Sequence, residues 1–204
     1  MDKTRKVAVI ELNTKIPFPG LILKVDLKKD YNKEAFNYGK ERSEKVLLLN
    51  KVEEGVYSKI GVLGIIDETQ DEPTVVLTDR FERYSCEEFV TKDGKILLMA
   101  EGEILEDREK SPQFEENYHK FVQAVNHYLK DDYAADTEDP DILVSFIAFN
   151  AFDFSQEERK NILAENSLES RMSYILKLIS SRSRKIRNNQ IAKIKESTTL
   201  RKTS

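Results

Sequence analysis

The apolar residues of this chain change their spacing about halfway along it, and this change limits the folds that the chain can adopt. Up to residue 105 they form short runs rich in Val, Ile and Leu, a pattern typical of strands. From residue 113 they recur at steps of three and four, the period of an amphipathic helix. Because strands come first and helices follow, the sequence predicts an α+β fold, with a β-rich domain over residues 1–108 and a helical domain over residues 112–204.

The first half contains several candidate strands and one candidate helix, at residues 31–42. A rigid connection follows the first strand, because Pro17 and Pro19 fix the backbone angle φ. Gly20 then allows the chain to turn into the next strand. The Asp-Gly pair at 93–94 is a hairpin-turn signal. Many short strands with one helix predict a compact barrel-like or two-sheet domain. The predicted strands are residues 6–12, 20–27, 45–49, 56–66, 75–77, 81–90 and 96–105.

Local start signals mark the helices of the second half. Residues 113–129 carry a continuous apolar face at helical spacing. Asp139-Pro140 combines an N-cap with a proline at the first helical position and predicts the start of an apolar helix that continues through residue 152. Ser155 and Glu158 have the spacing of a capping box, which predicts the start of another helix.

The last predicted helix begins at about residue 167, where Ser167 is the candidate N-cap. Its apolar stripe is dense as far as Ile179 and then thins to Ile186, Ile191 and Ile194 among basic and polar residues. A helix with so little apolar surface is not stable alone. We therefore expect this tail to be the start of a long helix directed toward a further part of the protein.

The formal net charge of −4 is unevenly distributed along the chain. Residues 180–204 carry a charge of +7, and residues 1–179 carry the remaining −11. An acidic body disfavours a general nucleic-acid surface, because the phosphate backbone favours clustered positive charge. The basic tail could supply a nucleic-acid contact, but no aromatic residue interleaves with its charges, which favours the connecting helix.

The composition also bears on the compartment. No apolar run reaches the ~18 residues of a membrane span. The N-terminal residues turn polar at Glu11, before the core of a signal peptide could form. The single cysteine, Cys86, excludes an internal disulfide framework and fits a reducing compartment. We therefore expect a cytoplasmic chain without a membrane partner.

No group of residues in the sequence indicates catalysis, a cofactor or a metal. His119 and His127 are eight residues apart, whereas helical metal pairs use i,i+4 spacing, so we expect surface positions. Cys86 has no indicated partner histidine and is expected to be a buried structural thiol. The acidic residues at 131–141 lack the alternating ligands and central glycine of a calcium loop and are expected to be solvated. No G-x-x-x-x-G-K-[ST] phosphate loop is present.

The proline-containing loop after the first strand supplies the candidate binding residues Ile16, Phe18, Leu21 and Leu23. If they lie on the surface, they form an apolar contact for unfolded chains, because exposed apolar patches mark interaction sites. The alternative is that they pack the interior of the β domain. The two interpretations differ in whether Phe18 is exposed.

The order and spacing of the elements form a family-like pattern. In the β half, Phe18-Pro19-Gly20 separates two strands, and Ile60-Gly61-Val62 lies in a later one. The helical half carries the larger set of matching positions, namely Glu158, Leu163, Glu165, Ser170-Arg171-Met172 and Leu176. Over nearly the whole chain this pattern resembles the N-terminal domain of the ATP-dependent Lon protease family.

Two positions depart from that family's pattern. Glu11-Leu12-Asn13 stands in the first strand where the family has Pro-Leu-Arg. Asp79 stands near the position of a family glycine that precedes a Glu-Arg pair, here Glu82-Arg83. Because aspartate tolerates positive φ better than most residues, we expect a turn to persist at Asp79.

The resemblance implies a PUA-like pseudo-barrel followed by a helical bundle. It also implies a homohexameric serine protease that degrades damaged, unfolded or degron-tagged proteins with ATP and Mg²⁺, this chain recruiting the substrates. The ATPase and protease domains would lie beyond residue 204, so we expect the chain alone not to be an enzyme. One alternative is a stand-alone protein-binding adaptor with the same domain. Another is a nucleic-acid-binding module, because the β part resembles RNA-binding pseudo-barrels.

Overall fold

The computed structural model describes residues 5–13, 16–54, 56–67, 73–90, 96–105, 107–129 and 139–182. Within these residues the strands precede the helices, apart from one helix in the first half, as the change in apolar spacing predicts. The predicted turn at 93–94, the acidic residues 131–138 and the tail beyond residue 182 lie outside the described residues.

The strands form one mixed sheet in the order β1-β7-β6-β5-β3-β4, with β2 paired to β6. The first half of β1 pairs antiparallel with β7, and its second half pairs parallel with β3. These two pairings join the ends of the sheet, so the strands close into the expected pseudo-barrel. The strands are β1 (Arg5–Leu12), β2 (Ile22–Lys24), β3 (Val46–Glu53), β4 (Val56–Tyr57), β5 (Ile60–Asp67), β6 (Thr74–Val90) and β7 (Ile96–Leu105).

Four predicted strands differ from the observed ones. The strand expected at 20–27 is only Ile22–Lys24. The strand expected at 56–66 is divided into β4 and β5, which pair with β3 in different registers. The strands expected at 75–77 and 81–90 are one continuous strand, β6. No turn interrupts it at Asp79; its pairing with β5 instead shifts register in this region, as at a β-bulge.

Both faces are buried over residues 7–12 of β1 and 46–50 of β3. Alternate residues of β1 belong to two different hydrophobic clusters, with Val9 in one and Ile10 in the other. Gly61 of β5 lies so close to β3 that an added Cβ would be 2.6 Å from the Leu48 carbonyl oxygen. The glycine in the family-like Ile60-Gly61-Val62 run is therefore required by the close approach of two strands.

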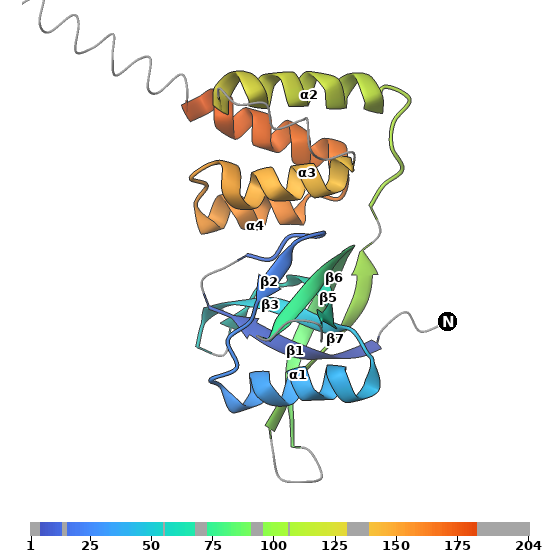
Figure 1. Cartoon of the computed structure of the whole chain (residues 1–204), viewed down its shortest axis with the longest axis vertical. Coiled ribbons are helices and arrows are strands. Elements are labelled where there is room, and N and C mark those ends of the chain that lie inside the picture. Colours follow the sequence, from blue (N-terminus) through green and yellow to red (C-terminus); the bar gives the residue numbers. More distant parts are fainter. Residues whose placement is uncertain are drawn as a thin grey trace, which may run out of the picture.

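Helix α1 (Asp30–Arg42) follows β2 and packs on β1 and β7. Gly39 brings it close to β3, since an added Cβ would be 2.6 Å from Val46 Cγ1. The helix ends at Ser43, which has φ 53°, and the N–H of Glu44 donates to the Gly39 carbonyl at 3.0 Å. In Figure 1, α1 lies at one end of the barrel and the other helices lie at the opposite end.

The helical half consists of α2 (Phe114–Leu129), α3 (Pro140–Phe146), the π-helical segment η2 (Ile147–Ala151), α4 (Gln156–Ala164) and a helix at 168–182. The expected caps are present, because Asp139 accepts from the Asp141 N–H and Ser155 forms a complete capping box with Glu158. The Ser167 hydroxyl oxygen accepts from the Ser170 N–H at 3.1 Å. The apolar helix predicted from Pro140 is confirmed, but its second part is a π-helix.

A buried ion pair ties the two halves together. Arg171, in the helix at 168–182, binds Asp107 in the connection after β7 through both of its terminal nitrogens. It also donates to the Glu165 carbonyl at 3.2 Å and lies 3.4 Å from Asp141 of α3. Near it, the Ser111 hydroxyl donates to Glu169 at 2.7 Å. The connection between barrel and helices is therefore held against the helical layer.

Candidate functional site

A buried carboxylate lies at the end of β1. The Glu11 side chain is fully buried and pairs with Lys29, which directly precedes α1. Its Oε2 accepts hydrogen bonds from the hydroxyls of Tyr31 at 2.8 Å and Tyr57 at 3.1 Å, and Lys51 Nζ is 3.9 Å away. Glu11, which departs from the family pattern, thus connects β1 to α1, β3 and β4.

The Asn32 side chain completes this network. Its Oδ1 accepts from the Glu11 N–H at 2.8 Å, and its Nδ2 donates to the Glu11 carbonyl at 3.1 Å and to the Asp26 carbonyl at 3.0 Å. Among the described residues, β1 pairs with β7 only over Arg5–Ala8, so no strand lies opposite β3 at Glu11. The amide of Asn32 therefore takes the place of a neighbouring strand at this point.

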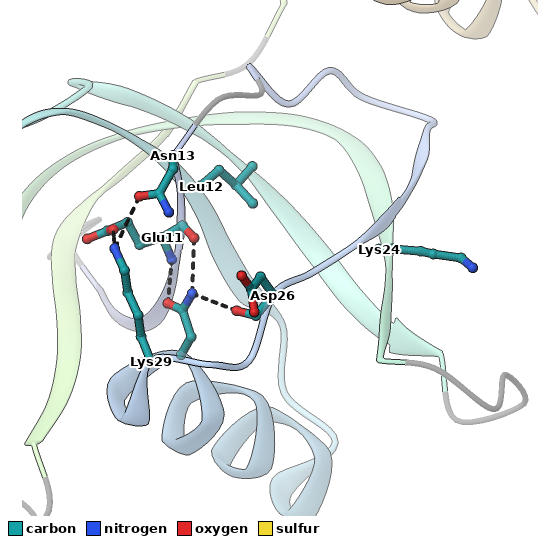
Figure 2. A pocket seen from close by; sticks show the side chains of 7 residues that line it. Glu11, Leu12, Asn13, Lys24, Asp26 and Lys29 are labelled. Atoms are coloured by element: carbon teal, nitrogen blue, oxygen red, sulfur yellow. Dashed lines mark hydrogen bonds and ion pairs between the residues drawn. The ribbon is translucent and has the colours of Figure 1, made fainter.

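A pocket of ≈ 340 Å³ opens beside this network. It lies between the end of β1 and the segment that runs from β2 to α1 (Figure 2). Figure 2 shows Lys29 and Glu11 directed toward one another and Lys24 directed away from them. The described lining residues offer hydrogen-bond donors and acceptors but no nucleophile with an adjacent base, so their chemistry suits binding. Its lining residues are Glu11, Leu12, Asn13, Lys24, Asp26, Lys29 and Asn32.

The charges in this network stabilise one another. Burial by itself would raise the pKa of Glu11, but hydrogen bonds from Lys29, Tyr31 and Tyr57 outweigh it and hold that pKa below its ordinary value of 4.5. The hydrogen bond to Glu11 in turn raises the pKa of Lys29 above its ordinary value. The network therefore contains an ionised carboxylate and an ammonium group at neutral pH.

We expect Glu11→Gln to lower the free energy of unfolding by about 2 kcal/mol at pH 7, because a charged hydrogen-bond acceptor is lost from a buried site. Since the folded-state pKa of Glu11 is lowered, its stabilising contribution is present above pH 4.5 and is lost as the pH falls through the folded-state value. Urea unfolding of both proteins across this range should show the difference between them shrinking at acidic pH. Glu116→Gln, at an exposed ion pair with Lys120, serves as the control and should change little. A difference that is independent of pH would contradict the assignment of an ionised Glu11.

The predicted apolar binding residues lie in the interior. Ile16, Phe18 and Leu23 are 2%, 1% and 4% exposed and belong to the hydrophobic core, and Leu21 is half-buried against it. The expectation that they form an exposed contact is therefore wrong for this folded state, and the alternative in which they pack the interior holds. The physical reason is that the proline-containing loop turns inward under the helical layer, where Gly20 lies against Ile142.

A different apolar surface is exposed at the junction of barrel and helices. It consists of Ile22 of β2 with Ile142 and Phe146 of α3, which are 67%, 38% and 37% exposed. An added Cβ on Gly20 would be 3.0 Å from Ile142 Cγ1, so the segment that leads into β2 lies directly beside α3. We call Ile22, Ile142 and Phe146 the junction surface. Ile142 and Phe146 lie one turn apart on α3, and exposed apolar groups on one side of a helix are typical of binding surfaces.

Sequence reasoning missed this surface for two physical reasons. Alternation along β2 places Ile22 and Leu23 on opposite faces, but alternation alone does not say which face is buried. Ile142 and Phe146 have i,i+4 spacing and share one side of α3, yet the whole segment is apolar, so its exposed side could not be recognised.

The structure gives no catalytic or metal-binding role to the other candidate residues that it describes. His119 and His127 are both exposed on α2. Cys86 lies on β6, but its side chain is outside the described residues. In the part of the chain that the structure describes, no three His, Cys, Asp or Glu side chains gather as a metal site would require. None of the described helices is both long and apolar enough to cross a lipid bilayer.

The fold and the junction surface define an α+β binding domain, a pseudo-barrel capped by a helical layer. The sequence profile of the ATP-dependent protease La (LON) substrate-binding domain matches residues 6–181. The chain therefore belongs to the LON substrate-binding domain family, and the resemblance seen in the sequence is confirmed.

Solved structures that share this fold include two Lon N-terminal domains. The N-terminal domain of the Mycobacterium avium complex Lon protease superposes with a TM-score of 0.68 at 16% identity, covering 86% of this chain and 98% of that one. A Lon N-terminal domain protein from Xanthomonas campestris gives a TM-score of 0.59 at 16% identity, covering 84% and 97%. A comparison with curated protein sequences gives no match.

Proposed function

We propose that this chain is the substrate-recruiting region of an ATP-dependent Lon serine protease, and that it captures apolar segments of unfolded or degron-tagged proteins. The observation that supports this proposal is the junction surface of Ile22, Ile142 and Phe146 on a domain of the LON substrate-binding family. An apolar segment that covers these side chains is stabilised by ~25 cal/mol for each Å² of apolar surface removed from water.

The proposal assigns the chemistry to other parts of the protein. ATP and Mg²⁺ would be used by an ATPase domain and peptide bonds cleaved by a protease domain, both outside these residues. A homohexamer in the cytoplasm fits this division, because weak binding sites repeated around a ring raise the effective concentration of a captured segment. The purified chain should accordingly show neither ATP hydrolysis nor peptide cleavage.

We expect the double variant Ile142→Ser, Phe146→Ser to bind a permanently unfolded protein, such as reduced and carboxymethylated α-lactalbumin, about tenfold more weakly, a loss of ~1.4 kcal/mol. The physical reason is the loss of exposed apolar area from α3. Fluorescence anisotropy of the labelled unfolded protein gives the affinity directly.

The matched control is the pair Val52→Ser, Val56→Ser on β3 and β4. These two valines are also about half exposed, at 46% and 49%, but lie outside the junction surface. Binding that falls equally in both double variants, or in neither, would show that the junction surface is not the capture site.

Two other functions make different predictions. A stand-alone adaptor would have a coding sequence that ends soon after Ser204, whereas a Lon protease would continue into a G-x-x-x-x-G-K-[ST] phosphate loop. A nucleic-acid-binding module would bind nucleic acid with an affinity that falls steeply as salt rises. An exposed apolar surface on an acidic body disfavours the nucleic-acid-binding module, whereas a stand-alone adaptor would use the same surface and is distinguished by its coding sequence.

A further inference from the structure

Strand β2 is paired along one edge. It pairs antiparallel with the start of β6, with Ile22 opposite Val76, Leu23 opposite Val75 and Lys24 opposite Thr74. No other strand of the described residues pairs with it. Its second edge therefore has no partner strand in the described residues; further along the chain, at Asp26, the Asn32 side chain bridges this edge to Glu11 of β1.

The hydrogen bonds of β2 show which main-chain groups point to that second edge. The Val25 N–H donates to the Pro73 carbonyl at 3.4 Å, so these two residues form a hydrogen-bonded pair. Hydrogen-bonded and non-hydrogen-bonded pairs alternate along an antiparallel ladder. Leu23 is therefore bonded to Val75, and Ile22 is in a non-hydrogen-bonded pair. The N–H and C=O of Ile22 point away from β6, toward the second edge.

The side chains of Leu23 and Ile22 show how β2 is anchored and which residue is accessible. Leu23 is buried in the core and anchors β2, whereas Ile22 is two-thirds exposed. The pocket of ≈ 340 Å³ lies between the segment after β2 and the end of β1 (Figure 2). An anchored strand with outward main-chain groups and an exposed apolar side chain is suited to accept another strand.

We propose that an extended segment of an unfolded polypeptide adds to the second edge of β2, pairing its main chain with Ile22 and placing an apolar side chain against the Ile22 side chain. This inference rests on the proposed capture of unfolded proteins and specifies how the captured segment is held. An extended chain fits because it brings unpaired N–H and C=O groups ~4.8 Å from the strand. A helix does not fit, because its main-chain groups are already bonded within it.

Backbone methylation of a synthetic peptide tests the main-chain pairing. The probe is a fluorescent peptide of about eight residues that alternates valine and serine, compared with two versions carrying N-methyl groups on all valines or on all serines. Because only alternate N–H groups face a neighbouring strand, one methylated version should bind about as well as the parent and the other at least about tenfold more weakly. Equal affinity of all three peptides would overturn strand addition.

Variants of the chain locate the binding edge. Ile22→Lys should weaken binding of the unmodified peptide by about tenfold, because a lysine on an edge strand opposes pairing with apolar segments. Ile65→Lys is the matched control: Ile65 is also exposed and pairs in register with Val76, as Ile22 does, but it lies on β5, on the far side of β6. Equal loss in both variants would show that the sheet face, not the edge of β2, binds the peptide.

The outcomes separate this inference from the proposed function. If the two methylated peptides bind alike but the chain still captures unfolded α-lactalbumin, strand addition fails and the proposed function stands. If neither the peptide nor the unfolded protein binds, the proposed function fails as well. If sedimentation shows a dimer that Ile22→Lys dissociates, a second copy of the chain occupies the edge and the inference is overturned.

Discussion

Replacing Arg171 with alanine is expected to lower the free energy of unfolding by about 3 kcal/mol, since removing one partner of a buried ion pair leaves the other charges uncompensated. The Arg171 side chain is 5% exposed, whereas Asp107 and Asp141 keep 28% and 34% of their side-chain surface. Water can therefore reach the two carboxylates after the substitution, which places the cost at the lower end of the range for buried pairs. Urea unfolding at pH 7 measures it.

Arg182→Ala is the control for this prediction. Arg182 pairs with Glu158 at 2.6 Å and lies over the Phe154 ring, but it is about one-third exposed. Partly exposed ion pairs contribute about 0–1 kcal/mol, so this variant should remain nearly as stable as the parent chain. If both variants lose the same amount of unfolding free energy, the ion pair between Asp107 and Arg171 does not stabilise the connection between barrel and helices more than an exposed pair would.

We expect Phe18→Ala to cost about 3–5 kcal/mol of stability, because it removes a large side chain from a site that is 1% exposed and leaves a cavity in the core. The folded fraction of this variant should bind unfolded protein as the parent chain does, since Phe18 is not part of the junction surface. Thermal unfolding gives the stability, and anisotropy measured at low temperature gives the binding.

Ile22→Ala provides the comparison for Phe18→Ala. Its side chain is two-thirds exposed, and surface substitutions usually stay within about 0.5 kcal/mol. An unchanged melting temperature with weakened binding in Phe18→Ala would reverse the assignment and restore Phe18 as a substrate contact.

Local signals in the sequence were sufficient for much of the helical half. Asp139, Ser155 and Ser167 each act at the helix start where their spacing predicted it, because a cap binds main-chain groups only two or three residues away. The strand β7 and the helices α1 and α2 were also predicted nearly to their ends. In these segments the apolar period and the flanking residues indicate the same structure.

Long-range pairing was not available from the sequence. The division of one predicted strand into β4 and β5 goes with a change in the register of their pairing with another strand, β3. The Glu11 network depends on partners in the segment before α1, in α1 itself and in two strands. In the sequence, Glu11 was only a departure from a family pattern, because a residue's type does not reveal which distant side chains will surround it.

The sequence by itself thus determined the α+β class and the family, which follow from the spacing and order of residues along the chain, and the starts of the helices beyond residue 112, which depend on contacts within a few residues. Only the tertiary structure decided which apolar residues are buried. Phe18 and Ile22 lie four residues apart and are both strongly apolar, yet one is in the core and the other is exposed beside α3. The physical reason is that burial depends on the elements that pack over a residue, and here those elements are helices more than a hundred residues further along the chain.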